Sequence, residues 1–541
     1  MTARPVEMRW RIRILPTFLC TTGFTFACAL CFLLFSVPRS PAALHASSNE
    51  QTAGVHYAVV VDAGSSGSRL YIYRCDYDRH TVKSILRVSP LLGRDGEPIV
   101  KKKNPGLSSF GNDPEKAVVY MKGLINGALD YIPKENVKQT SLFVLATAGM
   151  RLLPVQERTK VMKALQRALA SSYDFIVSET NIEIISGKWE GIYAWISVNY
   201  ALGRFERSPL LQTSVSTQPN SLASRRIRTA GILDLGGASL QVAYEVKRSA
   251  VHGLLNESFY QEINLGCNDT SPLFKFTVFV NTYLGYGANT AVELYENWLA
   301  KNLLKNLSCV MNEKSNAYSM CALYAPCVQS SNFFFVLILC RYSLGCPDSF
   351  FYSFSTLEVS DCCLPRGLTK RMQFGDTKIL DMIRSGSGCY HTCYKSLSEI
   401  IESNVTCAAA LCFLEGVYLP AIDFASTDFY GMSEYWYSTN DVLNLTGAYD
   451  HEVFEKSASD FCNLNWTSIW TLFRHKKFPN ADIARIRTQC FKAAWAFALL
   501  HKGLRFPVNI SNFHPVSRMS GHDIQWTLGA VLYRLRHLPL R

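Results

Sequence analysis

Short apolar runs that end in clusters of glycine and serine open the region after residue 55. An apolar, β-branched run over 57–62 leads into such a cluster and 70–74 follows it, which predicts two strands joined by a glycine-rich turn. Helical spacing of the apolar positions predicts helices over 114–131 and 155–170, separated by a buried strand over 141–146. This order of strands and helices is typical of a mixed α/β fold.

The hairpin pattern returns after residue 229. Apolar positions over 188–205 have helical spacing, and the basic, Ser/Thr-rich stretch 207–229 predicts an exposed loop. Residues 229–246 then repeat the apolar run, the glycine cluster and the second run. The end of the chain, 524–541, is partly apolar and carries three arginines, so we predict an amphipathic helix there.

The first 38 residues predict the compartment. Four arginines within 1–13 precede an uncharged stretch at 14–38, which exceeds the roughly 20 apolar residues that cross a bilayer. A positive flank stays cytoplasmic, so the body of the chain would face the lumen. We predict a cytoplasmic tail (1–13), a transmembrane signal anchor (14–38) and a stalk (39–55). A cleaved signal peptide is the alternative, and the length of the apolar run favours the anchor.

Sequons and cysteines support a lumenal body. Seven N-x-S/T sequons follow the predicted anchor, at Asn256, Asn268, Asn306, Asn404, Asn444, Asn465 and Asn509. Of the 18 cysteines, 15 lie beyond the anchor. Their spacing does not match a zinc site, so we predict disulfides in an oxidising compartment.

Composition excludes some classes of protein. With 541 residues, 48% hydrophobic and 18% charged, the chain is long enough for several globular domains. The net charge is +12, but the basic residues are scattered without a long Lys/Arg run, so we do not predict nucleic-acid binding. A basic surface can still attract anionic substrates.

The stretch 328–363 differs from its surroundings. It contains six phenylalanines and few charges, and its apolar part is far too short to span a membrane. Two interpretations stay open: a buried core element, or an insert produced by translated non-coding sequence.

The two glycine-rich hairpins carry the clearest chemistry. Residues 59–69 and 231–241 share one pattern, in which an apolar strand is followed by Asp-x-Gly, small residues and Ser. Glycine and serine allow backbone N–H groups to approach a phosphate closely. Asp62 and Asp234 end the two strands, where a carboxylate would suit a hydrated divalent cation. Two facing hairpins would therefore hold a polyphosphate between two lobes.

Hydrolysis also needs a base for the attacking water. Glu190 is the candidate, near the start of the predicted helix at 188–205. An acidic residue in the first turn also stabilises the helix dipole, and that interpretation is equally open from the residues alone.

Together with these two hairpins and Glu190, several further segments follow one another in the same order as the apyrase conserved regions of the nucleoside triphosphate diphosphohydrolases, a family that this chain resembles. The matching segments are Asp-Ala-Gly-Ser-Ser-Gly-Ser-Arg at 62–69, Thr-Ala-Gly-Met-Arg at 147–151, Glu190 with its flanks, Asp-Leu-Gly-Gly-Ala-Ser-Leu-Gln at 234–241, the aromatic segment 429–437 and Trp-Thr-Leu-Gly-Ala at 526–530. Details of the first motif, the aromatic segment and the C-terminal tail resemble the Golgi and lysosomal apyrase-like subgroup.

The resemblance implies a two-lobed actin-like fold, a duplicated RNase H-like α/β architecture with the active site in the cleft between the lobes. Lobe I would comprise 56–185, completed by 515–541, and lobe II would comprise 186–514.

The resemblance also implies roles for single residues. Glu190 would be the base, Ser239 and Gln241 would position the water with Thr147 in support, and Asp62 and Asp234 would hold Ca or Mg through waters. The phosphates would lie against Ser65, Ser66, Gly67, Ser68, Gly236, Gly237 and Ala238. Trp436 or Tyr437 would stack on the base. Leu240 departs from the family's usual Thr, but in a strand it points away from Ser239 and Gln241.

We therefore predict metal-dependent hydrolysis of nucleoside di- and triphosphates, with UDP and GDP favoured, to the monophosphate and phosphate. The enzyme would act in the Golgi lumen, anchored by its N-terminal helix, and would support glycosylation. A lysosomal or vesicle membrane and the cell surface are alternative locations. An actin-like ATPase and a catalytically impaired nucleotide-binding protein are the alternative functions.

Overall fold

The computed structural model describes the body of the chain. It covers residues 55–76, 85–206, 227–247, 257–266, 274–312, 357–374, 380–403, 414–417, 420, 422–519 and 522–537. The chain divides into two units, Met1–Ala53 and Gly54–Arg541, and every described residue belongs to the second. The predicted tail and anchor lie outside the described residues. Within the described part, no helix is long and apolar enough to cross a bilayer.

Lobe I is built on a mixed sheet in the order β3-β2-β1-β5-β6, with β4 also paired to β2. Its strands are β1 (His56–Ala63), β2 (Ser68–Asp76), β3 (Arg87–Pro90), β4 (Val100–Lys103), β5 (Ser141–Ala146) and β6 (Ile182–Ile184). β1 pairs antiparallel with β2 and parallel with β5. The predicted hairpin and the predicted strand at 141–146 are both confirmed.

Lobe II repeats this arrangement in the order β15-β14-β7-β8-β10-β9. Its strands are β7 (Gly231–Leu235), β8 (Ser239–Glu245), β9 (Tyr260–Asn264), β10 (Lys275–Leu284), β14 (Phe429–Ser433) and β15 (Phe513–Pro515). β7 pairs antiparallel with β8 and parallel with β14, as β1 does with β2 and β5. The matching topology of the two sheets confirms the predicted duplication.

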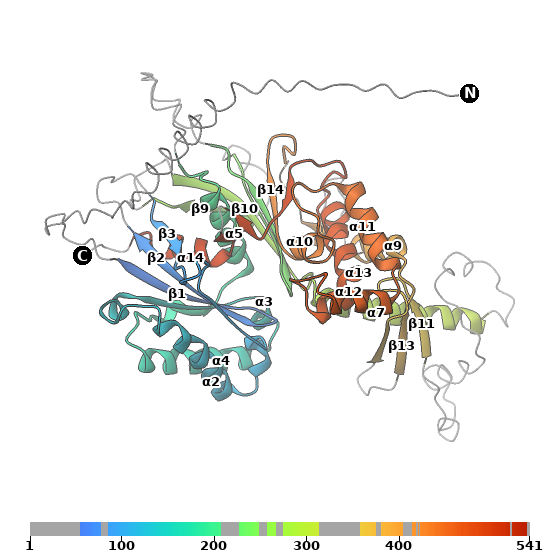
Figure 1. Ribbon diagram of the computed structural model, residues 1–541, viewed down its shortest axis with the longest axis horizontal. Helices are drawn as coiled ribbons and strands as arrows, with labels where there is room; N and C mark the ends of the chain where they lie inside the picture. Colours follow the sequence, from blue (N-terminus) through green and yellow to red (C-terminus); the bar gives the residue numbers. More distant parts are fainter. Residues whose placement is uncertain are drawn as a thin grey trace, which may run out of the picture. The chain divides into compact units, whose positions relative to one another are not determined.

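Helices cover both faces of each sheet, so the central strands are buried on both sides (Figure 1). On lobe I, α2 (Pro114–Leu129) and α4 (Val155–Ser172) pack against Val59 and Val61, and the other face meets α5 (Gly187–Ala201) and α14 (Trp526–Leu535). The same α5 lies against β8 and β10 of lobe II. A helix pair between the sheets thus joins the two lobes through one core.

The outer face of the lobe II sheet carries a larger set of helices. They are α7 (Thr290–Asn312), α9 (Tyr390–Ser403), α11 (His451–Asn463), α12 (Trp466–Arg474) and α13 (Ile483–Ala498). Aromatic side chains of this core pack around Trp495 and Phe497. A disulfide joins Cys462 of α11 to Cys490 of α13.

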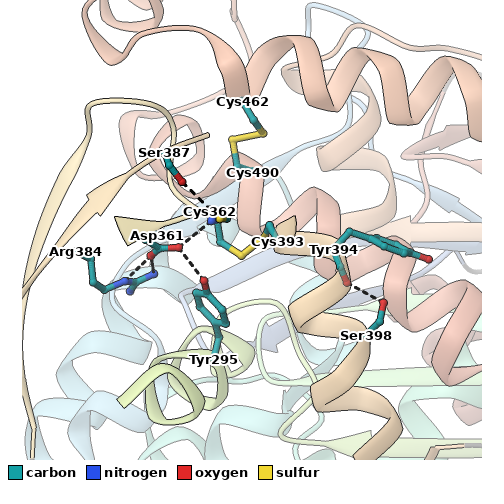
Figure 2. The surroundings of a disulfide bond; sticks show 11 residues. Tyr295, Asp361, Cys362, Arg384, Ser387, Cys393, Tyr394, Ser398, Cys462 and Cys490 are labelled. Carbon is teal, nitrogen blue, oxygen red and sulfur yellow. Dashed lines mark hydrogen bonds and ion pairs between the residues drawn. A yellow bond between two sulfur atoms is a disulfide. The ribbon is translucent and has the colours of Figure 1, made fainter. Parts of the chain in front are cut away.

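A small sheet extends lobe II beside these helices, formed by β11 (Leu357–Asp361), β12 (Thr369–Phe374) and β13 (Leu380–Gly386). Cys363 forms a disulfide with Cys393 of α9, next to Asp361 and its partner Arg384 (Figure 2). Residues 357–363 of the unusual stretch are therefore part of the fold, and the rest of that stretch lies outside the described residues. The predicted disulfides are confirmed for these two pairs.

The predicted helices agree with the structure to within a few residues. The helices predicted at 114–131, 155–170 and 188–205 correspond to α2, α4 and α5. The predicted C-terminal helix is α14, which is more buried than its arginines suggested because it packs on α5. Of the predicted exposed loop, 207–226 lies outside the described residues.

Candidate active site

The two glycine-rich turns are built alike. In the first, the Gly64 N–H donates to the Gly67 carbonyl at 3.1 Å, and in the second the Gly236 N–H donates to the Ser239 carbonyl at 2.9 Å. Asp62 pairs across its hairpin with Arg69, and Asp234 pairs with Gln241. The two carboxylates therefore occupy equivalent positions, each at the end of the first strand of its lobe.

The turns face each other across the cleft. A side chain on Gly237 would stand 2.6 Å from Ser65 Oγ, so the absence of one lets the second turn approach the first. Ser65, Gly237 and Ala238 line a cavity of about 320 Å³, together with Ser108, Ser109, Gly149, Leu152, Leu153, Asn289 and Thr290. The predicted phosphate residues Ser66 and Gly236 lie in the same turns, and Ser66 is exposed.

Ser68 differs from the other predicted phosphate residues. Its side chain is 1% exposed, and its hydroxyl has no hydrogen-bond partner among the described residues. Alternation along β2 places it on the opposite face from Arg69. Ser68 does not line the cavity that Ser65 and Gly237 share. Gly67 belongs to the turn, but it is packed against Lys103 and Asn104.

Four polar side chains meet at the cleft end of α5. Glu190 Oε2 accepts from Arg151 Nη2 at 2.8 Å and from Gln241 Nε2 at 3.3 Å. Ser239 Oγ lies 2.6 Å from Gln241 Nε2 and 3.3 Å from Arg151 Nη2. The residues predicted to activate and position a water are thus brought together, and Arg151 joins them to the segment that follows β5.

Tight packing of α5 on lobe II sets this geometry. A side chain on Gly187 would stand 2.2 Å from Thr282 Oγ1, and one on Gly191 would stand 3.0 Å from Val280. These glycines let the first turns of α5 approach β10, which carries Glu190 to Gln241. Leu240 is fully buried in the core on the other face of the sheet, as expected from strand alternation.

Burial dominates the electrostatics of the three carboxyl groups. It raises the pKa of Glu190 to about 7, against the opposing effect of Arg151, and the charges of Asp234 and Asp62 add to the increase. Burial likewise raises the pKa of Asp62 to about 6, although Arg69 opposes it. The pKa of Asp234 is also raised by burial, although its hydrogen bond from Ser433 lowers it. The cleft therefore has an excess of negative charge that is poorly solvated.

This charge suits a divalent cation held through its water molecules. Asp62 contacts Arg69 only at 3.7 Å, and Asp234 accepts from Ser433 Oγ at 2.7 Å, so each carboxylate keeps lone pairs for other donors. In the described part of the chain, no three His, Cys, Asp or Glu side chains group closely enough to bind an ion directly. The two carboxylates of Asp62 and Asp234 would suit a divalent cation that keeps part of its water shell.

The remaining predicted residues lie at different distances from this centre. Thr147 is buried directly after β5, and its N–H donates to the Ala63 carbonyl at 3.2 Å, beside the end of β1. Tyr437 lies close enough to Arg69 and Asp234 for their charges to change its pKa, which burial raises. Trp436 is partly exposed, and no contact joins it to the carboxylates in the described structure.

Several cleft residues had no role in the sequence analysis. Arg151 stands in the Thr-Ala-Gly-Met-Arg motif, and Ser433 stands in the aromatic segment, so both were visible in conserved-region matches. Asn289 lines the cavity from the start of α7, and nothing in the pattern of the sequence marked it.

A larger cavity of about 680 Å³ lies at the edge of the lobe I sheet, between β6 and α14. None of the predicted site residues line it. Its size alone does not associate it with the chemistry of the cleft.

Comparisons with known proteins agree with this geometry. The GDA1/CD39 (nucleoside phosphatase) family matches residues 48–541. Ectonucleoside triphosphate diphosphohydrolase 7 of Xenopus tropicalis is 35% identical over 501 residues, which covers 90% of this chain and 74% of that protein. Nucleoside-diphosphatase mig-23 of Caenorhabditis elegans is 34% identical over 490 residues, which covers 90% of this chain and 78% of that protein.

A solved structure shows the same fold. The nucleoside triphosphate hydrolase structure from Neospora caninum aligns with a TM-score of 0.54 at 14% identity, over 96% of this chain and 97% of that one. At this identity the similarity supports the two-lobed architecture and nothing finer.

Proposed function

The chain belongs to the GDA1/CD39 (nucleoside phosphatase) family and hydrolyses phosphate from nucleotides, and on that premise we propose a metal-dependent nucleoside diphosphatase that favours UDP and GDP. The observation that carries this proposal is the contact between Glu190, Gln241 and Ser239 beside two buried aspartates. The actin-like ATPase and the inactive receptor lack comparable support.

The two turns supply the means of binding the phosphates. In this proposal the terminal phosphate lies between Ser65 and Gly237, where turn N–H groups and hydroxyls can donate to its oxygens. Gly236 and Ala238 would complete the second side. The substrate is then fixed in line with the water, which accounts for much of the catalysis of phosphoryl transfer.

Glu190 would take the proton of the attacking water. Its carboxylate is oriented by Arg151, while Ser239 and Gln241 offer groups that can hold the water in line with the phosphorus. Attack breaks the bond to the terminal phosphate and gives phosphate and the shortened nucleotide directly, without a phosphoenzyme. A cation held through waters by Asp62 and Asp234 would neutralise charge on the phosphate oxygens.

The nucleoside side of the site rests on Tyr437. Its ring packs under the Arg485 guanidinium, 4.6 Å from the ring centroid, at the edge of the carboxylate cluster. We propose that this ring stacks on the base. Stacking on an aromatic face depends little on which base is present, so preference among bases must come from other groups.

We also propose a lumenal location, in the Golgi, for this activity. Support comes from the two disulfides and from the sequons, because the described acceptors Asn444, Asn465 and Asn509 are all exposed. Nucleoside diphosphates left by glycosyl transfer would then be its substrates.

The test is phosphate release by the purified full chain from UDP, GDP, ADP and the triphosphates, with Ca²⁺ or Mg²⁺ and with EDTA. We expect release that requires the cation and is fastest with UDP or GDP. Equal release in EDTA would contradict the proposed cation, and faster release from ATP than from any diphosphate would contradict the proposed preference.

A further inference from the structure

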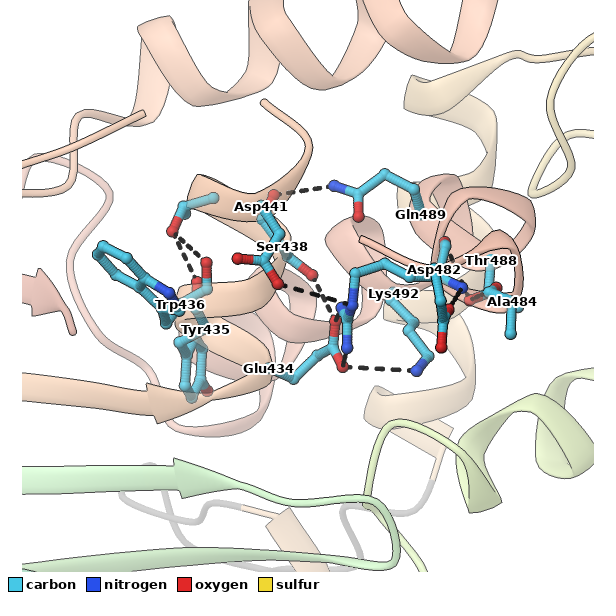
Figure 3. A network of polar contacts seen from close by, with 12 residues as sticks. Glu434, Tyr435, Trp436, Ser438, Asp441, Asp482, Ala484, Thr488, Gln489 and Lys492 are labelled. Atoms are coloured by element: carbon cyan, nitrogen blue, oxygen red, sulfur yellow. Dashed lines mark hydrogen bonds and ion pairs between the residues drawn. The ribbon is translucent and has the colours of Figure 1, made fainter. Parts of the chain in front are cut away.

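A buried charged cluster follows β14 directly, next to Ser433, whose hydroxyl contacts Asp234; its polar contacts are drawn in Figure 3. Glu434 is 4% exposed, and its carboxylate accepts from Arg485 at 2.7 Å and from Ser438 at 2.9 Å, with Lys492 Nζ at 3.5 Å. Burial alone would raise the pKa of Glu434, but Lys492 and Arg485 outweigh it and the pKa is lowered. We call these four residues the Glu434 cluster. Glu434, Ser438 and Lys492 have no role in the hydrolysis described above, and Arg485 enters it only by packing on Tyr437.

Helix α13 carries both cations of the cluster. Arg485 and Lys492 lie on one face of α13, seven positions apart, and Gln489 of the same helix donates to the Ser438 carbonyl at 2.8 Å. The disulfide through Cys490 ties this helix to α11. α13 therefore holds the segment that follows β14 at two points, through a carboxylate and through a carbonyl.

That segment begins with an unusual serine. The backbone of Ser433 has φ 56° and ψ −114°, a conformation that residues other than glycine rarely adopt. It is the last residue of β14, which pairs with β7, and its hydroxyl donates to Asp234 Oδ1 at 2.7 Å. A strained residue persists only where its surroundings hold it. Here β14 holds one side and Glu434, the next residue in the chain, holds the other.

We infer that the Glu434 cluster positions Ser433 so that its hydroxyl donates to Asp234, and that this hydrogen bond orients the Asp234 carboxylate toward a hydrated cation. The inference rests on the proposed function, which assigns the cation to Asp62 and Asp234. Arg485 and Lys492 hold the Glu434 carboxylate in place, and Glu434 in turn holds the backbone of Ser433, the residue before it. The Ser433 hydroxyl then donates its hydrogen bond to Asp234 Oδ1. The other oxygen of Asp234 is then left to accept from a water of the ion.

The experiment measures cation binding rather than turnover. CaCl₂ is titrated calorimetrically into the full chain saturated with the methylene-bridged analogue of UDP, for wild type, Ser433→Ala, Glu434→Gln and the double variant. We expect Ser433→Ala to weaken Ca²⁺ binding roughly tenfold, the usual scale for a hydrogen bond to a charged group. Glu434→Gln should weaken it about fivefold, and the double variant should be no weaker than Ser433→Ala alone.

The double variant separates positioning from an independent effect. Fully additive losses, or unchanged binding in Glu434→Gln, would overturn the inference while leaving the proposed function intact. Absence of Ca²⁺ binding and of cation-dependent phosphate release in wild type would overturn both. Lys492→Met removes one of the two cations and keeps the Glu434–Arg485 pair, so it should weaken Ca²⁺ binding about twofold. It replaces Glu434→Gln if that variant does not fold, and unchanged Ca²⁺ binding in Lys492→Met would then overturn the inference.

A matched control comes from the buried pair in Figure 2. Asp361 is fully buried and accepts from Arg384 Nε at 2.6 Å, but it lies in the small sheet of lobe II, away from the hairpins. Asp361→Asn should lower the melting temperature as Glu434→Gln does, yet leave Ca²⁺ binding unchanged. If it weakens Ca²⁺ binding as much, general destabilisation explains both variants and the inference fails.

Discussion

Arg151 and burial act in opposite directions on Glu190. Burial raises the pKa of this carboxyl to about 7, and Arg151 opposes that increase from 2.8 Å. A base must be ionised, so kcat/KM should fall as the pH drops through the pKa of the free enzyme. Arg151 thus keeps Glu190, the proposed base, ionised at a lower pH than burial alone would allow.

Replacing Arg151 should therefore move the acid limb of the pH–rate profile. In Arg151→Met the pKa of Glu190 rises further, and we expect the limb of kcat/KM to shift upward by roughly one unit, together with a lower plateau. The check is kcat/KM for UDP from pH 5 to 9 at fixed Ca²⁺, with Lys160→Met on an outer helix as the control. A downward shift would contradict the assignment of Glu190 as the base.

The ionised Asp62 carboxylate should destabilise the folded protein when no cation is bound. Its folded-state pKa is about 6, above the ordinary 3.8, so its ionisation opposes folding. Its contribution to stability is greatest below pH 4 and is lost as the pH rises through 6. Asp62→Asn removes this cost, and we expect the melting temperature in EDTA at pH 7.5 to rise by roughly 1–4 °C. A fall would mean that the pairing with Arg69 outweighs burial.

For single residues, the sequence was enough to predict which residue types form the site, but not how their side chains are placed. Asp62 and Asp234 follow from the repeated pattern, because a strand ending in Asp-x-Gly fixes where their backbones lie, whereas the roles of Ser239 and Gln241 came from the family resemblance. The pattern does not say which face of β2 approaches a ligand, so it did not predict that the Ser68 side chain is buried on the face opposite Arg69. Arg151 and Ser433 were not given roles, since their contacts join segments 39 and 199 positions apart.

At the scale of elements, the contact between α5 and α14 joins the lobes. A side chain on Gly529 would stand 2.0 Å from the Tyr193 carbonyl oxygen, and the Gly529 N–H donates to Ser197 Oγ at 2.7 Å. The backbones of two helices thus touch where only glycine fits. The Tyr193 carbonyl oxygen belongs to the main chain of α5, so it cannot move aside for a larger residue as a flexible side chain could.

Gly529→Ala should therefore destabilise the protein by about 1–3 kcal/mol, the usual scale for overpacking a core. Gly127→Ala, within α2, is the matched control, because its added carbon would meet only Lys101 side-chain atoms at 3.7 Å or beyond. That variant should be neutral or slightly stabilising, since alanine favours helix. Urea unfolding of both variants decides; equal stabilities would contradict the packing described here.

Elements of the first half were predictable because their periodicity is strong. β5 and α4 match their predicted ranges, and both hairpins follow from apolar runs broken by glycine. The later helices were not assigned from the sequence, because helical segments and cysteine-containing loops alternate there without clear boundaries. The small sheet of lobe II was missed for another reason: Asp361 and Arg384 are charged residues, and their burial as a pair depends on the fold.

At the scale of the whole molecule, duplication explains the site. Each lobe contributes one hairpin with one carboxylate, and helices α5 and α14 hold the two sheets against one core. A polyphosphate that contacts both turns therefore bridges the lobes. The proposed base, Glu190, lies on α5, the helix shared between them, so the proposed proton transfer would take place where the two halves meet.

The central claim is that this shared cleft hydrolyses nucleotides with Glu190 as the base, and one comparison tests it most directly. Phosphate release from UDP with Ca²⁺ is measured for the full chain, for Glu190→Gln and for Glu179→Gln, an exposed glutamate nearby. We predict a fall of about 10²- to 10⁴-fold in kcat for Glu190→Gln, the usual contribution of a general base, with its melting temperature unchanged or raised. Glu179→Gln should match wild type. A folded Glu190→Gln protein that releases phosphate at the wild-type rate would contradict the account.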